Sequence, residues 1–220
     1  MASSYLQNIH VLVAEDNHFS RRIVEEILKI LGATNISFAR NGEEAWEAIK
    51  GEMPDLVLLD WEMAPMDGLE FLQRIRHDPA SPNPYLPIIM TTGYSDRWHV
   101  FQARDAGVNE YVTKPMSAKT LMGRIQAVIE RPRRFVRIGK FFGPDRRRQD
   151  KLYMGPDKRG LEDAVAAKKA APPPEQHMGQ DEINALFNPD GEPAPDDAGP
   201  SNENAQPATP GDGKEPSTAG

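Results

Sequence analysis

The stretch that decides the fold is residues 55–60, which read DLVLLD, an aliphatic run between two aspartates. A short apolar run bounded by polar residues is typical of a parallel strand that is buried on both faces of its sheet. Working outward from it, further strand-like runs occur at 9–14, 35–39, 87–91 and 110–113. Segments with apolar residues at helical spacing alternate with these runs, at 23–31, 43–50, 67–77, 96–106 and 117–130.

This repeated alternation of strand and helix predicts an α/β fold. Right-handed crossovers favour a doubly wound five-stranded parallel sheet in the flavodoxin-like order 2-1-3-4-5, with helices on both faces. Ligands bind such sheets beyond the carboxyl ends of the strands, at the point where the strand order reverses. Candidate functional residues are therefore expected at that edge.

Composition divides the 220-residue chain into three parts. Residues 1–130 carry the strand and helix pattern and are predicted to form one globular domain. Residues 131–160 are a basic extension rich in arginine and aromatic side chains. Residues 161–220 are acidic and proline-rich, and a segment this polar is expected to be largely disordered. Two short helices are predicted within it, at 161–170 and at 179–188.

Several classes of protein are disfavoured by the sequence. The chain has no cysteine, which rules out disulfides and cysteine metal sites. The absence of a signal-peptide pattern and of any apolar run near the ~18 residues of a membrane span predicts a cytoplasmic protein that does not bind membranes. The net charge of −7 opposes non-specific nucleic-acid binding, and residues 131–220 show no helix-turn-helix pattern, so specific DNA binding is not expected.

Polar residues follow the ends of the predicted strands. Glu15 and Asp16 follow the first strand, and Asp60 closes the third. Crowded carboxylates repel one another, and Mg²⁺ suits oxygen ligands of this kind. With Mg²⁺ bound, one carboxylate can act as a nucleophile toward a phosphoryl group. Thr92, after the fourth strand, and Lys114, after the fifth, can then stabilise the transferred oxygens.

The motifs that carry these residues closely resemble the receiver domain of two-component response regulators, especially the single-domain chemotaxis type. The matching pieces are VLVAED at 11–16, SRRIV at 20–24, DWEM at 60–63, MDG at 66–68, IMTTG at 89–93 and Lys114-Pro115. The resemblance implies that Asp60 is the phosphoacceptor. One departure is Ala64-Pro65, where the family usually has proline directly after the methionine, and a local change of loop shape is expected there.

The resemblance also implies roles for the neighbouring residues. Glu15 and Asp16 would hold Mg²⁺ together with Asp60 and the backbone carbonyl of Glu62. Thr92, which lies 22 residues before Lys114, would be the hydroxyl that meets the phosphoryl group. Tyr111 would be the aromatic switch residue, and Lys114-Pro115 would be a cis peptide.

The implied function is a phosphorylation-switched response regulator in chemotaxis or flagellar control. It would take phosphate from a histidine kinase and signal by protein–protein contacts. It would not be an enzyme, apart from slow loss of its own phosphate. A phosphate sink, whose main task is to accept and hydrolyse phosphate, is an alternative.

The basic extension suggests a second alternative. Arg133 and Arg137 have the Arg-x-x-x-Arg spacing that resembles one half of the cyclic di-GMP motif of PilZ domains. Arginine interleaved with aromatic residues also suits phosphate contacts and stacking. The extension would then bind cyclic di-GMP or another phosphate-rich partner. A solvated basic segment folded back on the acidic domain fits the same residues.

The tail holds one motif, MGQDEINALF at 178–187. Ile183, Leu186 and Phe187 would share one face of a short helix, which suits docking in a groove. The motif resembles the N-terminal peptide of flagellar motor-switch proteins, which docks on the face formed by the fourth helix, fifth strand and fifth helix of phosphorylated chemotaxis receivers. Such a peptide could dock on its own receiver or recruit another one, and a chance amphipathic turn has the same pattern.

Overall fold

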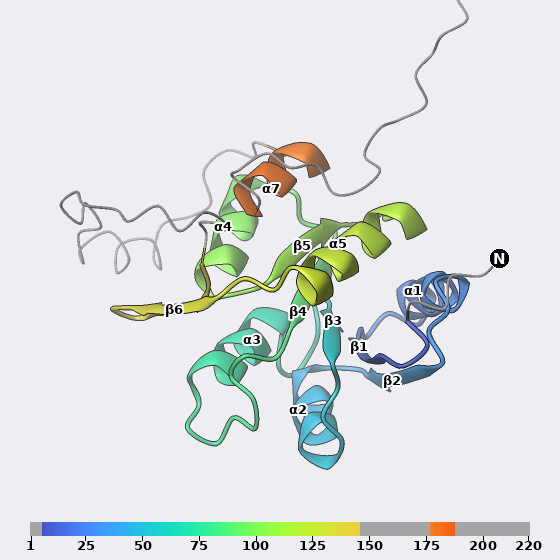
Figure 1. Ribbon diagram of the computed structural model, residues 1–220, viewed down its shortest axis with the longest axis horizontal. Helices are drawn as coiled ribbons and strands as arrows, with labels where there is room; N and C mark the ends of the chain where they lie inside the picture. The colour runs from blue at the N-terminus through green and yellow to red at the C-terminus, as the bar shows by residue number, and fades with distance from the viewer. Residues whose placement is uncertain (1–5, 146–176, 188–220) are drawn as a thin grey trace, which may run out of the picture.

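The computed structural model describes residues 6–145 and 177–187 (Figure 1). Its elements are β1 (His10–Ala14), α1 (His18–Ile30), β2 (Asn35–Ala39), α2 (Gly42–Gly51), β3 (Leu56–Leu59), α3 (Gly68–His77), β4 (Ile88–Thr92), α4 (Arg97–Asp105), β5 (Glu110–Thr113), α5 (Ala118–Glu130), β6 (Phe135–Ile138), β7 (Phe141–Pro144) and α7 (Gln180–Phe187). The predicted helix at 161–170, the predicted disorder of the acidic tail and residues 146–160 of the basic extension lie outside the described residues. None of the helices in the described ranges is long and apolar enough to cross a membrane.

The first five strands form one parallel sheet in the order β2-β1-β3-β4-β5. This arrangement confirms the predicted α/β fold and strand order. Successive side chains of a strand point to opposite faces of the sheet, so each central strand supplies both apolar layers. In β3, Val57 and Leu59 pack under α2, α3 and α4, whereas Leu56 and Leu58 pack under α1 and α5.

The helices begin at side-chain caps that the sequence supplies. An Asn, Asp or Ser side chain accepts a backbone N–H in the first turn of each helix from α1 to α5, which satisfies donors that the helix itself leaves free. These caps are Asn17, Asn41, Asp67, Asp96 and Ser117. Asp67 forms a full capping box with Glu70. The caps fix where the loops at the carboxyl edge of the sheet give way to helix.

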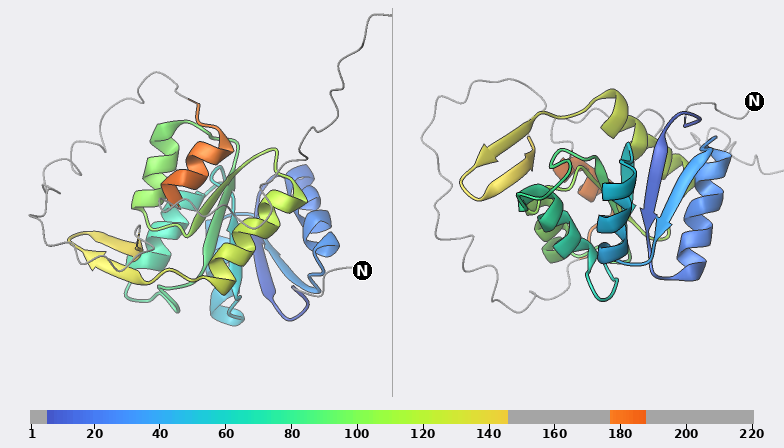
Figure 2. Two further views of the ribbon diagram at one scale, coloured as in Figure 1. Left: turned by 45° about the horizontal axis from the view of Figure 1, so that its top comes forward. Right: turned by 90° about the horizontal axis from the view of Figure 1, so that it is seen from below.

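The part of the basic extension that is described folds as a β-hairpin, which the sequence analysis did not anticipate. β6 and β7 pair antiparallel around a two-residue turn, in which Gly139 has a φ of 57°. Phe135 and Phe142 of the hairpin pack edge-on against Tyr85, at 5.2 and 5.3 Å between ring centroids. The hairpin therefore contacts the domain through an aromatic cluster of Tyr85, Phe135 and Phe142, and Figure 2 shows it at the edge of the α/β domain.

A buried arginine ties the hairpin to the α3 side of the domain. Arg76 of α3 is 1% exposed. Its guanidinium donates to the Gly107 carbonyl at 2.9 Å, the Pro84 carbonyl at 2.8 Å and the Asn109 Oδ1 at 2.9 Å. It also lies over the Phe135 ring, 5.0 Å from its centroid. Burial without an acidic partner lowers the pKa of Arg76 to about 9.

The short helix α7 returns to the domain from far along the chain. It lies beside α4 and β5 in Figure 1 and in the left view of Figure 2. The residues before it also contact the domain, since the Met178 N–H donates to the Ser95 carbonyl at 2.8 Å and His177 forms an isolated β-bridge with Asp96. The tail segment 177–187 is thus packed on the α/β domain itself.

Candidate functional site

Three carboxylates meet at the carboxyl edge of the sheet. Glu15 and Asp16 follow β1, and Asp60 follows β3. Adjacent strands bring them together, because the Asp60 N–H donates to the Ala14 carbonyl at 2.9 Å and continues the β1–β3 pairing. One ligand oxygen from each lies within 4.8 Å of the others. Glu15 and Asp60 are buried, whereas Asp16 is exposed at the mouth of the site.

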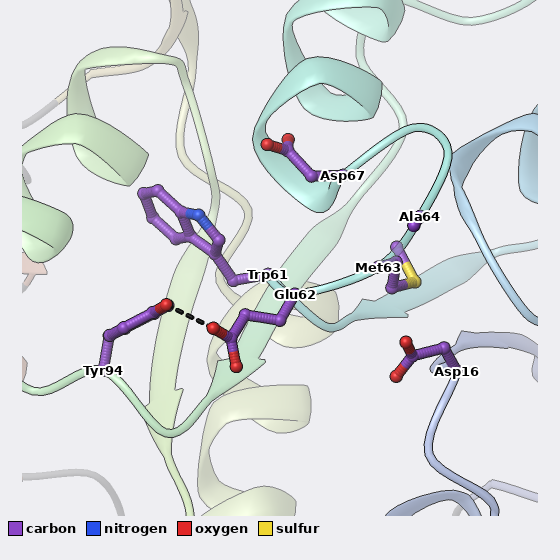
Figure 3. A pocket seen from close by; sticks show the side chains of 7 residues that line it. All are labelled: Asp16, Trp61, Glu62, Met63, Ala64, Asp67 and Tyr94. Carbon is purple, nitrogen blue, oxygen red and sulfur yellow. Dashed lines mark hydrogen bonds between the residues drawn. The ribbon is translucent and has the colours of Figure 1, made fainter.

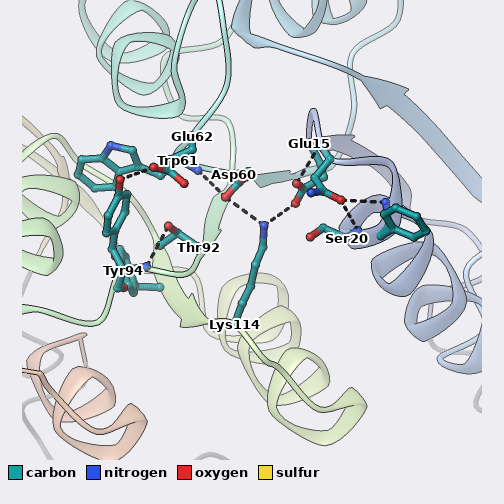
Figure 4. A network of polar contacts seen from close by, with 11 residues as sticks. Glu15, Ser20, Asp60, Trp61, Glu62, Thr92, Tyr94 and Lys114 are labelled. Atoms are coloured by element: carbon teal, nitrogen blue, oxygen red, sulfur yellow. Dashed lines mark hydrogen bonds and ion pairs between the residues drawn. The ribbon is translucent and has the colours of Figure 1, made fainter.

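Lys114 supplies the nearest positive charge. Its N–H donates to the Thr92 carbonyl at 2.8 Å, which extends the β4–β5 pairing to the edge. Its Nζ lies 2.5 Å from Glu15 Oε2 and 3.1 Å from Asp60 Oδ1, between the two buried carboxylates (Figure 4). The peptide bond between Lys114 and Pro115 is cis, as the resemblance implied, and the bond between Ala64 and Pro65 is cis as well.

The charges of this cluster are unbalanced in favour of the anions. Burial raises the pKa of Glu15 to about 7, helped by the Asp60 charge and opposed by the hydrogen bond from Lys114. Burial also raises the pKa of Asp60, and Lys114 opposes this shift. One ammonium cannot neutralise three carboxylates, and the donors are the hard oxygens that Mg²⁺ prefers. The residues present therefore fit a divalent cation.

The raised pKa of Glu15 leads to a pH-dependent stability. In metal-free buffer, the free energy of unfolding is expected to fall as the pH rises from about 4.5 to about 7. The folded protein keeps the Glu15 proton up to about pH 7, whereas the unfolded chain releases it near the usual value of 4.5, so the folded state binds more protons in this window. The stabilisation that the Glu15 proton gives is fully present below about pH 4.5, the pKa of this group in the unfolded chain. It is lost as the pH rises through about 7, the pKa of Glu15 in the folded protein.

Urea denaturation at a series of pH values across that window, with a chelator present, would measure this slope. The Glu15→Gln variant, which has no proton to lose, should show a flatter profile. Identical profiles for the two proteins would contradict the assignment of the slope to Glu15.

A glycine lets the loop after β3 close over the site. The Gly68 N–H donates to the Trp61 carbonyl at 2.9 Å. A Cβ atom at Gly68 would lie 2.0 Å from the backbone oxygen of Asp60. Only a residue without a side chain fits there, so the start of α3 is held directly against the backbone of Asp60.

The two candidate switch residues, Thr92 and Tyr111, both contact Tyr94. Thr92, at the end of β4, is buried, and its Oγ1 accepts the Tyr94 N–H at 3.3 Å. Tyr111 of β5 is 1% exposed. Its hydroxyl donates to the Tyr94 carbonyl at 2.8 Å. Tyr94 therefore joins Thr92 and Tyr111 through its backbone, a connection that the sequence analysis missed.

An aromatic group that was also missed borders the site. Tyr94 stacks on His99 at 3.8 Å between centroids, and Trp61 meets both rings edge-on. The Tyr94 hydroxyl donates to the Glu62 carboxylate, and this contact raises the pKa of Tyr94 to about 12. The side chain of Glu62 thus turns toward Tyr94 (Figure 3).

A pocket opens next to these residues. Its volume is about 450 Å³. The lining residues come from the loops after β1, β3 and β4, as Figure 3 shows: Asp16, Trp61, Glu62, Met63, Ala64, Asp67 and Tyr94.

The candidate residues of the extension and tail lie elsewhere. Arg137 of β6 is exposed and lies over the Phe142 ring at 4.4 Å. Arg133 instead points back to the domain and to α7, with its side chain 9% exposed. Ile183 and Phe187 are buried against the domain, and Leu186 is partly buried. The two arginines therefore make different contacts, and Arg133 is joined to the tail motif.

Comparison with known proteins agrees with this site. Residues 11–126 match the family of the response regulator receiver domain. The matched segment contains all three carboxylates, Thr92, Tyr111 and Lys114. This chain belongs to the response regulator receiver domain family.

Similar proteins come from chemotaxis. The chain is 35% identical over 125 residues to chemotaxis protein CheY-3 of Vibrio cholerae, covering 57% of this chain and 95% of the relative. It is 34% identical over 121 residues to chemotaxis protein CheY of Pseudomonas aeruginosa, covering 55% of this chain and 96% of the relative. Each match covers little more than half of this chain, and both support a receiver of the chemotaxis type.

Solved response regulators are also similar to about half of this chain. A putative response regulator from Chloroflexus aurantiacus superposes with a TM-score of 0.52 at 28% identity, covering 56% of this chain and 98% of that one. Chemotaxis protein CheY4 from Vibrio cholerae superposes with a TM-score of 0.50 at 26% identity, covering 55% of this chain and 98% of that one.

Proposed function

We propose that this protein is a phosphorylation-switched response regulator of bacterial two-component signalling, with Asp60 as phosphoacceptor and with an output in chemotaxis or flagellar motility. The observation that carries the proposal is the position of Asp60, buried at the end of β3 within reach of Lys114 and beside two further carboxylates. Membership of the receiver family and the similarity to chemotaxis proteins support it. A cytoplasmic location and a receiver that ends near residue 130 belong to the same proposal.

Asp60 and Lys114 would have different roles in phosphoryl transfer. An Asp60 carboxylate oxygen forms a bond to phosphorus while the bond from phosphorus to the histidine nitrogen of a kinase breaks, and that nitrogen keeps the electron pair. Lys114 Nζ, already 3.1 Å from Asp60 Oδ1, would stabilise negative charge on the transferring oxygens. Water would later attack the phosphorus of the acyl phosphate, the bond from phosphorus to the Asp60 oxygen would break, and inorganic phosphate would leave, which returns Asp60 to its free carboxylate in a slow step that needs no further domain.

Mg²⁺ would be held by Glu15, Asp16 and Asp60, with the backbone carbonyl of Glu62 as a further ligand. When bound, the ion supplies positive charge that offsets the attacking carboxylate and the phosphoryl oxygens. The excess of carboxylates over ammonium groups at the site supports this assignment.

The signal would leave the site through Thr92 and Tyr111. Thr92 Oγ1 would turn to the phosphoryl oxygens, which ends its contact with the Tyr94 N–H. The Tyr94 carbonyl also accepts the hydroxyl of Tyr111. A movement of Tyr94 would therefore change the position of Tyr111 in β5. The face of α4 and β5 would then be repacked, which is how a local charge change becomes a binding signal.

The alternatives differ in what they require of this face. A phosphate sink needs no output surface, whereas here a helix of the chain itself is docked on α4 and β5, which favours an output role. Cyclic di-GMP binding at Arg133 and Arg137 would require Arg133 to leave its contacts with the Phe187 carbonyl and Glu110. Calorimetry with cyclic di-GMP on the full chain tests that alternative.

Beryllofluoride, a mimic of the phosphoryl group, tests the proposed function. With Mg²⁺ present, ¹⁵N NMR of the full chain is expected to show shifts at Thr92, Tyr111 and the residues around Asp60. Trp61, next to the acceptor, should report the same event by fluorescence. Beryllofluoride with a chelator in place of Mg²⁺ should leave both signals unchanged. If no amide near Asp60 shifts with Mg²⁺ and beryllofluoride together, the phosphoacceptor assignment fails.

A further inference from the structure

The docked helix α7 is built into the core of the receiver. Ile183 is 0% exposed and Phe187 is 1% exposed. They join the apolar layer that also contains Val100 and Ala103 of α4. The Phe187 ring lies nearly parallel to the Tyr111 ring, with centroids 6.2 Å apart and 14° between planes. The tail motif thus buries its apolar face on the surface between α4 and β5.

A glutamine fixes the position of α7 along β5. Gln180 Oε1 accepts both the N–H and the hydroxyl of Thr113, each at 2.8 Å. Its Nε2 donates to the Tyr111 carbonyl at 3.1 Å. β5 is the edge strand of the sheet, so these backbone groups have no neighbouring strand. The carboxamide of Gln180 replaces the peptide group that a further strand would offer.

An arginine of the extension holds the other end of α7. Arg133 Nη1 donates to the Phe187 carbonyl at 3.0 Å. The last carbonyls of a helix lack partners within the helix and carry partial negative charge, so a guanidinium there is favourable. The other nitrogen, Nη2, contacts the Asn109 carbonyl and lies 3.4 Å from Glu110 Oε1. Arg133 therefore joins β5, the start of the extension and the end of α7.

These three contacts define a recognition pattern. The groove requires an amide side chain that pairs with the edge of β5, an apolar residue three positions later, and an aromatic residue seven positions later whose carbonyl reaches Arg133. A helix of eight residues gains little stability by itself, so its order comes from the docking. The pattern is specific in direction, because Gln180 and Arg133 contact opposite ends of the helix.

We propose that α7 is a built-in competitor for the surface between α4 and β5: it occupies this surface in cis through Gln180, Ile183 and Phe187 and blocks it against other helices until it is released. An outside protein that uses the site would present a helix of the same pattern and would have to displace α7. Because α7 is tethered, it competes at an effective concentration on the order of millimolar. Gln180 and Arg133 are its positioning residues.

A competition experiment on the full chain tests this proposal. The probe is a fluorescently labelled synthetic peptide of residues 176–190. The variant Ile183→Ser/Phe187→Ser removes the apolar anchors of α7 and should leave the site open. It is expected to bind the peptide at least ~10-fold more tightly than the wild type, in line with the loss of a tethered competitor. The matched control Ala185→Ser, a change on the exposed side of α7, should bind as weakly as the wild type.

Two further variants test the ends of the helix. Gln180→Ala and Arg133→Gln in the full chain should each release α7 in part and give intermediate binding of the probe. A probe that itself carries Gln180→Ala should bind the open variant more weakly than the original probe. These substitutions leave the apolar core in place. Binding of the probe to these variants therefore tests the proposal even if the double variant does not fold.

The outcomes are decisive in both directions. Equal binding by the wild type and the folded double variant would show that α7 does not occupy the site. An absence of binding to the folded double variant would show that the surface does not recognise this helix. Neither result touches the phosphoacceptor assignment, because the titration uses no phosphoryl donor, no Mg²⁺ and no beryllofluoride.

Discussion

Replacement of Asp60 by asparagine is expected to lower phosphorylation of the protein by at least ~100-fold, to the background of the assay. The carboxamide has no negative charge and cannot form the acyl phosphate, so the covalent step is lost rather than slowed. Incubation with acetyl phosphate and Mg²⁺, followed by intact-mass measurement, would show the added phosphoryl group in the wild type and its loss in the variant. Acetyl phosphate serves as a small donor in place of the kinase.

The sequence offers a matched control at the other end of the same strand. Asp55 precedes β3 and accepts the His10 N–H at 2.8 Å, far from the acceptor edge. Asp55→Asn should retain phosphorylation. The Asp60→Asn protein should also be at least as stable as the wild type, because burial raises the pKa of Asp60 and a neutral side chain avoids that cost. Phosphorylation of Asp60→Asn at the wild-type level would place the acceptor elsewhere.

Replacement of Arg76 by methionine is expected to lower the free energy of unfolding by about 3 kcal/mol or more. The buried Gly107 carbonyl and the partly buried Pro84 carbonyl both lose their donor, and Asn109 Oδ1 keeps only its hydrogen bond from the Ile88 N–H. Each buried acceptor left without a partner costs roughly 1–3 kcal/mol. The apolar part of methionine fills much of the same volume, so the loss reflects the missing hydrogen bonds more than a cavity.

Arg74, two residues before Arg76 on α3, is the control for this change. Its side chain is 38% exposed, pairs with Asp78 and lies over the Trp46 ring at 4.1 Å. Exposed ion pairs and cation–π contacts contribute about 1 kcal/mol or less each. Urea denaturation should therefore separate Arg76→Met clearly from Arg74→Met, and equal losses for both variants would contradict the structural role of Arg76.

The receiver part of the chain could be predicted because its signals are local. The run at 55–60 identifies a strand buried on both faces, and the parallel alternation then brings Glu15, Asp60 and Lys114 to one edge. No long-range information is needed to expect this cluster. The identity of Asp60 as the acceptor, in contrast, comes from the family resemblance.

The parts that could not be predicted depend on contacts across the fold. Arg76 lies on an amphipathic helix, where an arginine is usually on the surface, and its burial arises only because the hairpin and the loop at Gly107 cover it. The hairpin itself had a signal, since Gly139 separates two aromatic and aliphatic runs. Because arginines surround this segment, the sequence indicated phosphate binding rather than a hairpin. The helical spacing of Ile183 and Phe187 was visible, but the surface that receives them was not.

The contact between Gln180 and Thr113 has a consequence for the dynamics of the sheet. The Thr113 amide lies on an edge strand and its hydrogen is held by a side chain of the tail. Its exchange with deuterated solvent therefore requires α7 to lift away, whereas amides within β4 need a larger opening. The exchange rate of this single hydrogen thus measures the fraction of time that the groove is open at β5.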